Sequence, residues 1–336
     1  MSGKKQPAKR SVLQRVTLGL YVVAVVISLV VVVSYIALKL FAPAPEVPNQ
    51  VEFPLTSDNP PEQSGGVTED PTESAPPEKL VLHRREGVYT CLLLGVADQG
   101  GTDTVMLGVF DTEGKTAALI SIPRDTVVYY NGEYQKINAA YADGAEGVAQ
   151  CVREMLAVPV DYYASVNFRA FKGIVDEIGG VWFNVPPGMD YDDPTDNLSI
   201  HLTPGYQKLN GEDALKLVRC RSAYASQDIG RAATQRAFLA ALVKQTFSLY
   251  NLDKIPELIN ILKAYVRTDM ELNEMVYFGT QAFGMDLDAA LTSTVLSTNW
   301  VYPYIEPGEE EVLALVNSLG IYEEEVPAEV LRLAHP

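Results

Sequence analysis

The chain has 336 residues, enough for one or two domains with a sizeable buried core. Its formal net charge is −17, and beyond residue 40 it carries 43 acidic but only 20 basic residues. This balance argues against a nucleic-acid-binding protein, because affinity for nucleic acid comes from neutralising phosphates with basic side chains.

The first 38 residues have the pattern of a membrane anchor. Residues 1–15 contain five basic residues and no acidic one, and the 23 residues of 16–38 carry no charge. Such an apolar run is long enough to cross a bilayer as a helix. A cleaved signal peptide is the alternative, but its apolar region would be shorter, and no convincing A-x-A site follows Lys39. The basic tail predicts that residues 1–15 are cytoplasmic, that residues 16–38 form a single transmembrane helix, and that the rest is extracellular.

Residues 39–79 are predicted to form an extracellular stalk. Nine prolines and eight acidic residues lie between positions 42 and 79, with few large apolar side chains. Such a segment cannot bury enough apolar surface to fold by itself, so we expect it to be semi-extended and disordered. It would hold the following extracellular domain, residues 80–330, away from the membrane.

From about Leu80 onward, strand-like and helix-like patterns alternate along the chain. Apolar runs predict strands at 88–96, 104–110, 116–122, 162–166 and 181–185, and a strand-like segment at 294–299. Helices are predicted at 146–156, at 168–178, from the N-cap Asn210 to Leu217, behind Asp228, and near 253–266, 272–284 and 309–319. Residues 186–199, rich in Asp and Pro, are expected to form a loop. This alternation predicts a single α/β domain with a mixed central sheet flanked by helices on both faces.

The stretch between two of these predicted elements contains closely spaced arginines. Arg219 and Arg221 are two positions apart, so in an extended segment both would point to one face and Cys220 to the other. Two guanidinium groups on one face are suited to bind an anion with several oxygens.

The helix behind Asp228 adds further polar groups to this stretch. Asp228 is a suitable N-cap, and Arg231 and Gln235 stack on one helical face behind it. The buried stripe is expected on a different side, at Phe238, Leu239, Leu242 and Phe247. These residues predict an anion-binding site where the extended segment meets a helix N-terminus. The alternative is a set of solvated charges on an ordinary surface helix.

Three turns that follow predicted strands carry more candidate side chains, as is usual for sites in open α/β sheets. Asp98 and Asp103 flank a Gly-rich turn that can hold Mg²⁺ with phosphate oxygens, the alternative being an Asx-turn with surface aspartates. Pro123 ends a strand and places Arg124 beyond it, the alternative being a surface Arg–Asp pair. Lys136 is the third candidate, with a solvated lysine as its alternative.

The sequence offers no motif for covalent catalysis. There is no P-loop, no GxGxxG and no Ser-His-Asp order, and no catalytic context surrounds His83, His201 or His335. The cysteines lack C-x-x-C spacing and are predicted to be buried free thiols: Cys91, Cys151 and Cys220. What remains is an arginine–aspartate–metal site that handles a phosphate or pyrophosphate.

Seven sequence blocks occur in order between residues 88 and 248. They are LLLGVAD…TDTVML, SIPRDT, KINAAYADG, VDYYASVNF, IVDEIGGVWFNVP, LNGEDALKLVRCR and DIGRAATQR. Together they resemble the LytR-CpsA-Psr (LCP) family of bacterial cell-envelope proteins, and the predicted anchor and stalk fit that family too. The resemblance implies an LCP-type α-β-α domain and a phosphotransferase. Such an enzyme moves a glycopolymer, such as teichoic acid or capsular polysaccharide, from an undecaprenyl-pyrophosphate carrier onto peptidoglycan, with magnesium.

The resemblance also implies roles for individual residues. Pyrophosphate binding is expected from Arg124, Lys136, Arg219, Arg221, Asp228, Arg231 and Gln235. Direct roles in catalysis are expected for Asp98, Asp103, Arg124 and Arg221, with Asp98 and Asp103 as metal ligands. The sequence departs from the family pattern in three places. Thr234 and Gly101 stand where arginines are usual, and Asp98 comes one residue late.

The implied mechanism depends on positioning and electrostatics rather than on a protein nucleophile. The arginines would hold the two phosphates, Mg²⁺ would bridge phosphate oxygens, and an aspartate would orient or deprotonate the glycan hydroxyl. By analogy, the predicted helices 146–156 and 168–178 are candidates for a groove that holds the lipid.

Two alternatives remain for the function. One is a non-catalytic binder of polyprenyl pyrophosphate that regulates the envelope, and the other is a pyrophosphate hydrolase that uses water in place of the sugar hydroxyl. The departure at Gly101 favours the binder slightly, whereas the intact Arg219, Arg221, Asp228 and Arg231 favour transfer.

Overall fold

The computed structural model describes residues 42–54, 79–96, 101–193, 198–220, 223–224, 228–246, 260–261, 263–282 and 285–336. The chain separates into two compact units. The smaller contains the residues up to Pro45 and Glu271–Thr280, which include most of helix α7 (Leu272–Ala282). Within it, the Thr280 hydroxyl donates to the Tyr277 carbonyl at 2.7 Å. The larger unit, Glu46–Met270 and Gln281–Pro336, contains the sheet and the candidate site.

The larger unit is built on a six-stranded sheet with the order β13-β8-β3-β4-β5-β14. In that order the strands span Val266–Thr268, Tyr162–Asn167, Val88–Val96, Thr102–Asp111, Thr116–Ile122 and Leu291–Val295. β3, β4 and β5 are antiparallel neighbours, whereas β8 lies parallel to β3 and β14 parallel to β5. The edge strand β13 is antiparallel to β8. The predicted mixed sheet is therefore confirmed.

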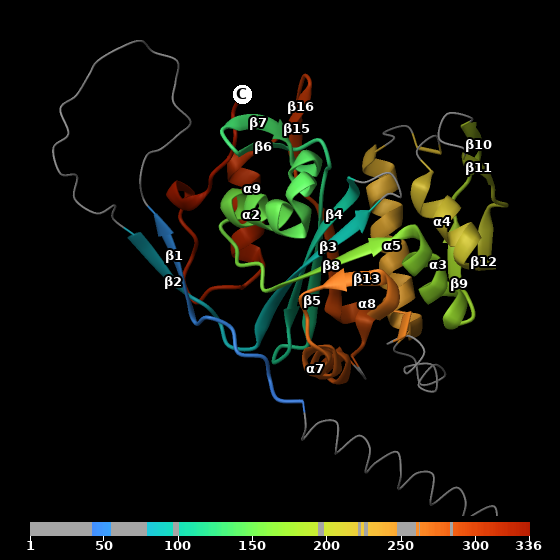
Figure 1. The fold of residues 1–336 in the computed structure, drawn as a ribbon, viewed down its shortest axis with the longest axis horizontal. Helices are drawn as coiled ribbons and strands as arrows, with labels where there is room; N and C mark the ends of the chain where they lie inside the picture. Colours follow the sequence, from blue (N-terminus) through green and yellow to red (C-terminus); the bar gives the residue numbers. More distant parts are fainter. Residues whose placement is uncertain are drawn as a thin grey trace, which may run out of the picture. The chain divides into compact units, whose positions relative to one another are not determined.

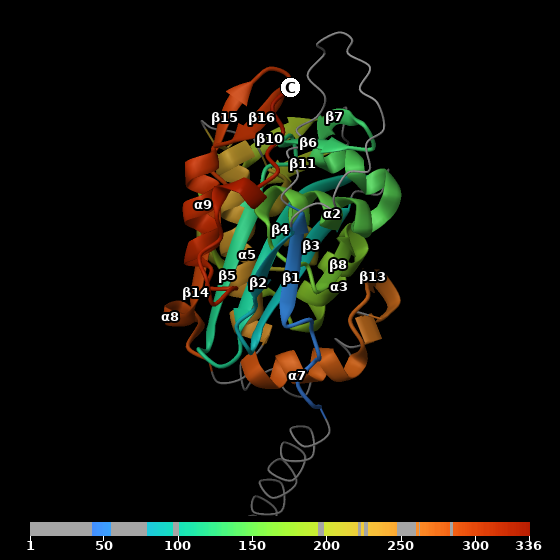
Figure 2. The same cartoon turned by 90° about the vertical axis from the view of Figure 1, so that its left-hand side faces the viewer.

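One face of the sheet is covered by the 3₁₀ segment η1 (Ile137–Asp143) and helices α2 (Gly144–Leu156) and α9 (Glu309–Ser318), as Figures 1 and 2 show. The sheet residues Leu92, Leu107 and Ile120 share one fully buried core with Val148 of α2 and Val312 of α9. Burying each such side chain contributes about 1.5–3 kcal/mol relative to leaving it exposed. This face therefore forms the main core.

The opposite face carries helices α3 (Phe168–Glu177), α4 (Gly211–Arg219) and α5 (Asp228–Thr246) (Figure 1). Asn167 caps α3 by accepting from the Ala170 amide at 2.8 Å. Asn210 caps α4 as predicted, accepting from the Asp213 amide at 2.8 Å. The antiparallel pair β9 (Val181–Val185) and β12 (Gly205–Leu209) belongs to the same layer. A second core forms here around Val175, Leu217 and Phe238.

Part of the predicted stalk is folded. Strand β1 (Gln50–Pro54) pairs antiparallel with β2 (Lys79–His83). Val51 and Phe53 pack against the main core, and the Phe53 ring meets Tyr322 edge-on at 6.4 Å. The prediction of disorder is wrong for residues 50–54, because apolar residues alternate there with polar ones and bury one side of a strand. The surrounding prolines and acids obscured that alternation.

Several hairpins surround the sheet. They are β6 (Val127–Tyr130) with β7 (Glu133–Lys136), β10 (Asp190–Asp193) with β11 (Leu198–His201), and β15 (Thr298–Val301) with β16 (Tyr304–Pro307). Short segments α8 (Leu287–Ala290) and η3 (Ala328–Val330) complete the described elements. The prediction of a loop at 186–199 is wrong for residues 190–193 and 198–199, which belong to β10 and β11. The hairpin is held because Ile200 of β11 is fully buried in the second core. The single strand predicted at 294–299 is in fact the end of β14 and the start of β15.

Some predictions lie outside the described residues. These are the transmembrane helix at 16–38 and most of the helical pattern at 253–266. Among the helices that the structure does describe, none is long and apolar enough to span a membrane.

Candidate functional site

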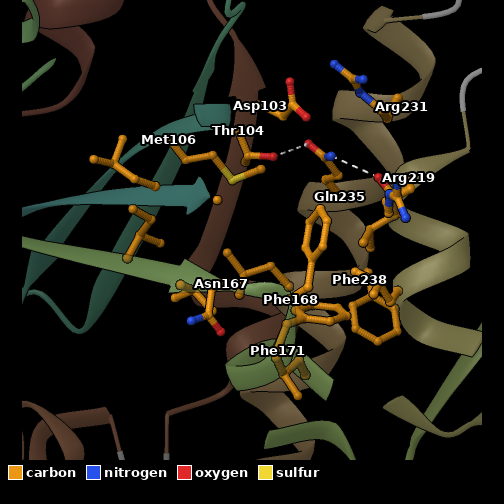
Figure 3. A pocket seen from close by; sticks show the side chains of 18 of the residues that line it. Asp103, Thr104, Met106, Asn167, Phe168, Phe171, Arg219, Arg231, Gln235 and Phe238 are labelled. Carbon is orange, nitrogen blue, oxygen red and sulfur yellow. Dashed lines mark hydrogen bonds between the residues drawn. The ribbon is translucent and has the colours of Figure 1, made fainter. Parts of the chain in front are cut away.

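A cavity of about 550 Å³ lies between the sheet and helices α3, α4 and α5; we call it the first cavity. Polar side chains line one end of it: Asp103, Thr104, Arg231 and Gln235. The rest is mainly apolar, with Phe168, Phe171, Ile174, Phe238 and Leu239 among its lining residues, together with Arg219, Asn167 and Tyr191. Figure 3 shows Asp103 and Arg231 at one end and the three labelled phenylalanines at the other. The cavity therefore changes from charged to apolar along its length.

Helix α5 contributes to both ends of the first cavity. Arg231, Gln235, Phe238, Leu239 and Leu242 all line it. Our prediction that the phenylalanine and leucines face a different side from Arg231 and Gln235 is wrong. Steps of four, three and four residues return to the same face of a helix with about 3.6 residues per turn. One face of α5 thus runs from a cation at its N-terminal end to leucines about three turns later.

Gln235 connects α5 to the sheet and to α4. Its amide oxygen accepts from Thr104 Oγ1 at 3.3 Å, and its amide nitrogen donates to the Val218 carbonyl at 2.9 Å (Figure 3). Thr104 sits close to Gly95 on the neighbouring strand, where an added Cβ would lie 2.9 Å from the Thr104 Cβ. A glycine is needed there. Gln235 thereby sets the position of α5 relative to the polar end of the cavity.

Arg219 enters the first cavity from the last turn of α4. Its guanidinium carbon lies 4.9 Å from the centroid of the Phe168 ring, within cation–π distance. The prediction of an extended segment is wrong at Arg219, because the helix continues to that residue and extended backbone begins at Cys220. Ala214 and Leu217 are buried on the inner face of α4, and this packing carries the helix past the predicted end. A cation at a helix C-terminus is also favoured by the helix dipole.

Asp103 and Arg124 form an ion pair at the edge of the sheet. The start of β4 lies beside the end of β5 because the two strands are antiparallel, and Arg124 Nη1 donates to Asp103 Oδ1. Both side chains are partly exposed. Both also line a second cavity of about 490 Å³, which we call the second cavity.

The two cavities meet at a shared wall. The residues that line both are Asp103, Thr104, Met106, Arg231 and Gln235. The second cavity continues past this wall to Ser121, Arg124 and Trp300. These five side chains therefore contact both cavities.

Lys136 lines neither cavity. Its Nζ is 2.9 Å from Asp125 Oδ1, and the other carboxylate oxygen of Asp125 is 4.0 Å from Arg124 Nε. Lys136 and Arg124 therefore both contact the carboxylate of Asp125. The structure does not bring it to the shared wall.

Three predicted site residues cannot be placed from the described structure. Asp98 and Arg221 lie outside the described residues, and for Asp228 only the backbone is described, at the first position of α5. Among the described residues, no group of three His, Cys, Asp or Glu side chains has metal-site geometry. Asp103 can still serve as a magnesium ligand, because Mg²⁺ is commonly held by one or two carboxylates together with substrate phosphates.

The first turn of α5 is packed tightly against Tyr224. An added Cβ at Gly230 would lie 2.3 Å from Tyr224 Cγ, so only glycine fits there. The Tyr224 hydroxyl is hydrogen-bonded to Thr234 Oγ1 at 2.5 Å, and burial raises the pKa of Tyr224 above its ordinary value. Thr234, where the family pattern has an arginine, thus holds Tyr224 rather than an anion. This contact fixes the turn that carries Arg231.

A hydrogen-bonded Ser–His–Asp chain occurs on the β10–β11 hairpin, which the sequence order did not suggest. Ser199 Oγ is 3.0 Å from His201 Nε2, and His201 Nδ1 is 2.6 Å from Asp190 Oδ1. The same Nε2 is 3.4 Å from Asp192 Oδ1. All these groups are exposed and line neither cavity. The arrangement is a surface ion-pair cluster rather than a catalytic triad.

The cysteines are free, as predicted. Cys151 and Cys220 are buried, whereas Cys91 is intermediate in exposure. Burial raises the pKa of both Cys91 and Cys151 to about 12, so neither is a reactive thiolate at neutral pH.

The sequence predictions for the cavities are right for one helix, wrong for another, and missed the second cavity. Of the helices suggested for a lipid groove, 168–178 does line the first cavity, but 146–156 lies on the opposite face of the sheet. The second cavity was not predicted. Trp300 lies beyond the recognised blocks, and Ser121, although it opens the block SIPRDT, is flanked by two isoleucines of an apolar strand, so no local signal identified either residue.

Comparison with known proteins connects this geometry to one family. Residues 62–315 match the LytR_cpsA_psr family model. The polyisoprenyl-teichoic acid–peptidoglycan teichoic acid transferase TagV of Bacillus subtilis (strain 168) is 30% identical over 247 residues, which cover 68% of this chain and 62% of TagV. TagU of Enterococcus faecalis, a transferase of the same description, is 28% identical, with 62% of this chain and 70% of TagU covered. The match thus spans less than two thirds of the length of TagV.

Solved structures show the same fold. TagT bound to LIIa-WTA superposes with a TM-score of 0.60 at 27% identity, covering 70% of this chain and 90% of TagT. The crystal structure of B. subtilis TagV gives a TM-score of 0.60 at 26% identity, covering 70% of this chain and 96% of that structure.

Proposed function

The chain belongs to the LytR_cpsA_psr family, and from this membership and the geometry of the site we propose that it is a glycopolymer transferase. It takes a glycopolymer from a polyprenyl-pyrophosphate carrier and attaches it through phosphate to peptidoglycan. The names of TagV and TagU, polyisoprenyl-teichoic acid–peptidoglycan teichoic acid transferases, describe that class of reaction.

The observation that carries the proposal is the change of character along the first cavity. A polyprenyl pyrophosphate has two phosphates at one end and a long hydrocarbon chain at the other. The cavity has Asp103 and Arg231 at one end and Phe171 and Phe238 at the other, and Arg219 lies between them with its guanidinium over the Phe168 ring. Ligand sites are mostly apolar with a few placed polar groups, and here the two parts are ordered as in the lipid. The phosphates would bind at the shared wall and the prenyl chain among the phenylalanines.

The proposed reaction is an in-line phosphoryl transfer. The acceptor hydroxyl oxygen forms a bond to the phosphorus that carries the glycopolymer. The phosphoanhydride P–O bond breaks, and its electron pair leaves with the polyprenyl phosphate. Asp103, at the shared wall, accepts the hydroxyl proton, while Arg219 and Arg231 stabilise the negative charge on the leaving phosphate.

We include Mg²⁺ as a cofactor of this reaction, held by Asp103 together with substrate phosphate oxygens. When bound, it would neutralise charge on those oxygens. Asp98, outside the described residues, is the second proposed ligand on sequence grounds. Arg124 donates to Asp103 and would keep its carboxylate oriented toward the shared wall.

The proposed location is the cell membrane, with the catalytic domain outside. Its support is the uncharged run at 16–38 behind a basic tail, which suits a single-pass anchor with its N-terminus in the cytoplasm. A site outside the membrane is where peptidoglycan and lipid-linked glycans meet.

The test is a transfer assay with the full chain in detergent micelles. A polyprenyl-pyrophosphate-linked glycan with a radiolabelled sugar is incubated with peptidoglycan, with and without Mg²⁺. Label attached to peptidoglycan through phosphate supports the proposal. Release of free glycan phosphate in the absence of acceptor identifies a hydrolase instead, and lipid binding without either product identifies a non-catalytic binder.

A matched pair of variants tests the cavity itself. Leu239→Trp places a bulky ring on the face of α5 that lines the first cavity, and Ala237→Trp places it on an exposed position of the same helix. The first variant should lose lipid binding because the prenyl chain no longer fits, and the second should retain it. Equal affinity in both variants would place the lipid elsewhere.

A further inference from the structure

The second cavity has a chemistry of its own, different from that of the first. Its wall opposite α5 is formed by the ends of β5 and β14 and by the β15–β16 hairpin. Trp300 on β15 lines it although the side chain is 67% exposed, so one aromatic surface remains accessible beside the cavity. Aromatic rings with a few polar groups are the usual lining of a site for a flat, partly apolar ligand.

A buried hydroxyl in the second cavity has no hydrogen-bond partner in the part of the chain that the structure describes. Ser121 is 3% exposed and lines the cavity, and its Oγ has no hydrogen-bond partner among the described residues. Its neighbours Ile120 and Ile122 belong to the main core, so Ser121 points to the other face of the sheet. A buried hydroxyl without a partner costs about 1–3 kcal/mol, which a ligand with hydroxyl or amide groups would recover.

The β15–β16 hairpin is held in place beside the catalytic residues. The Ile305 amide donates to the Asp125 carbonyl at 3.1 Å, and the Leu296 amide to the Ser121 carbonyl at 2.9 Å. Ile305 pairs with Trp300 across the hairpin. Backbone bonds thus connect the Trp300 strand to the segment that carries Arg124, and the position of the ring relative to the shared wall is defined.

In-line transfer requires the attacking oxygen and the leaving phosphate to lie on opposite sides of the phosphorus. If the lipid occupies the first cavity and the phosphates lie at the shared wall, the acceptor must approach through the second cavity. Asp103 lies at the boundary between the two, where it can meet the acceptor hydroxyl.

We infer that the second cavity is the acceptor site, where a sugar ring of the peptidoglycan glycan strand packs on Trp300 and hydrogen-bonds to Ser121. The ring's C–H face suits the indole, and its hydroxyl or acetamido group suits the Ser121 Oγ. This inference rests on the proposed transferase function. It adds a specificity surface that joins Ser121 of the SIPRDT block to Trp300, which lies outside the recognised blocks.

Binding is measured first, without any donor. The chain contains two tryptophans, so in a Trp182→Phe background the fluorescence of the full chain in micelles reports on Trp300 alone. The probe is a defined tetrasaccharide of alternating N-acetylglucosamine and N-acetylmuramic acid. A saturable change in Trp300 fluorescence is expected, with its midpoint moved to a severalfold higher tetrasaccharide concentration in Ser121→Ala. No change at millimolar tetrasaccharide would overturn the inference.

Transfer kinetics with the same tetrasaccharide as acceptor give the second measurement. Trp300→Ala should raise the KM for the acceptor about tenfold and leave the KM for the lipid donor unchanged, with Trp300→Phe intermediate. The matched control is Trp182→Ala, which removes a 47% exposed tryptophan that lines neither cavity. If Trp300→Ala weakens only cosedimentation with lipid vesicles, the hairpin contacts membrane and the inference is wrong.

Ser121 separates a binding role from a structural one. Ser121→Ala should raise the acceptor KM severalfold while the protein is as stable as before or more so, because the removed hydroxyl made no hydrogen bond. Ser165→Ala is the control: its Oγ is also buried without a partner among the described residues, but it lines neither cavity. Ser165→Ala should therefore leave the protein as stable as before or more so and should not change the acceptor KM.

The outcomes distinguish this inference from the proposed function. Transfer by the unmodified chain, with acceptor KM unchanged in both Trp300→Ala and Ser121→Ala, overturns the acceptor site and leaves the transferase standing. Tetrasaccharide binding that depends on Trp300 and Ser121, without any transfer, supports the glycan site and overturns the transferase.

Discussion

Arg124 donates a hydrogen bond to the carboxylate of Asp103 beside the wall that the two cavities share. The two residues are 21 positions apart in the chain and meet because β4 and β5 are antiparallel. The family pattern usually has an arginine two positions before this aspartate, where this chain has Gly101. Arg124 supplies a guanidinium group next to Asp103 from the turn that follows β5.

Asp103→Asn should reduce Mg²⁺-dependent transfer at least about 100-fold, because the amide neither accepts a proton nor binds the cation well. The free energy of unfolding should change by less than about 1 kcal/mol, since the ion pair is partly exposed. Transfer rates and urea denaturation measure the two effects. The control is Asp213→Asn, another partly exposed, paired carboxylate, outside both cavities. Normal turnover by Asp103→Asn would remove Asp103 from the mechanism.

Arg219→Ala should weaken binding of a polyprenyl pyrophosphate by roughly 1.5–3 kcal/mol, the usual contribution of a charge-assisted hydrogen bond. Arg219→Lys should recover only part of this affinity, because lysine lacks the bidentate fork. Arg169→Ala is a close control, since Arg169 also stacks on an aromatic ring, 5.6 Å from the centroid of Tyr265, but lines neither cavity. Titrating the polyprenyl pyrophosphate into each variant measures these affinities. Equal losses in both arginine variants would point to a nonspecific charge effect.

Gly230→Ala should destabilise the protein by roughly 1–3 kcal/mol, because the new methyl group collides with the Tyr224 ring and displaces the turn that carries Arg231. Gly173→Ala on α3 is the matched substitution in a helix with room for a methyl group, whose nearest neighbour would be 3.6 Å away. It should be neutral or stabilise by about 0.4–1 kcal/mol. Thermal melting of both variants tests the contrast, which would disappear if Tyr224 can move without cost.

Arg84→Ala should cost about 3–5 kcal/mol of stability, because it leaves a buried carboxylate without its cation. Arg84 makes two hydrogen bonds to Asp161, at 2.6 and 2.8 Å, and both side chains are almost completely buried. Lys79→Ala removes one partner of the exposed pair with Glu52 and should cost less than about 1 kcal/mol. Urea denaturation should separate the two variants clearly. Similar values would show that the Arg84 pair is solvated.

His201 should titrate above the ordinary histidine range. Its pKa is raised first by the hydrogen bond to Asp190 and further by the charge of Asp192. A raised pKa in the folded state means that this contribution to hairpin stability is fully present below the ordinary histidine pKa. It is lost as pH rises through the raised value. NMR titration of the His201 ring tests this, and Asp190→Asn should lower the midpoint. Transfer activity should not follow this titration, because His201 lines neither cavity.

The sequence by itself determined most of the elements around the site. Strands 88–96 and 116–122 were predicted with their observed bounds, and the Asn210 cap was identified from residue type alone. These predictions succeed because side-chain alternation and helix capping are local properties of a few consecutive residues. The ordered blocks likewise indicated the family, which the match over residues 62–315 confirms.

Only the tertiary structure shows which side chains from different helices and strands lie together. Helical periodicity puts Phe238 on the same face as Arg231 and Gln235, but only the packing shows that this face lines one cavity. Periodicity gave no indication that Trp300 and Ser121 line one cavity with Asp103. The β15–β16 hairpin reaches the end of β5 only because β14, far along the chain, pairs with β5 and leads into β15. A local pattern reports the direction in which a side chain points from its own element. The partner it meets depends on non-local packing, and the residues that line the first cavity come from seven different elements.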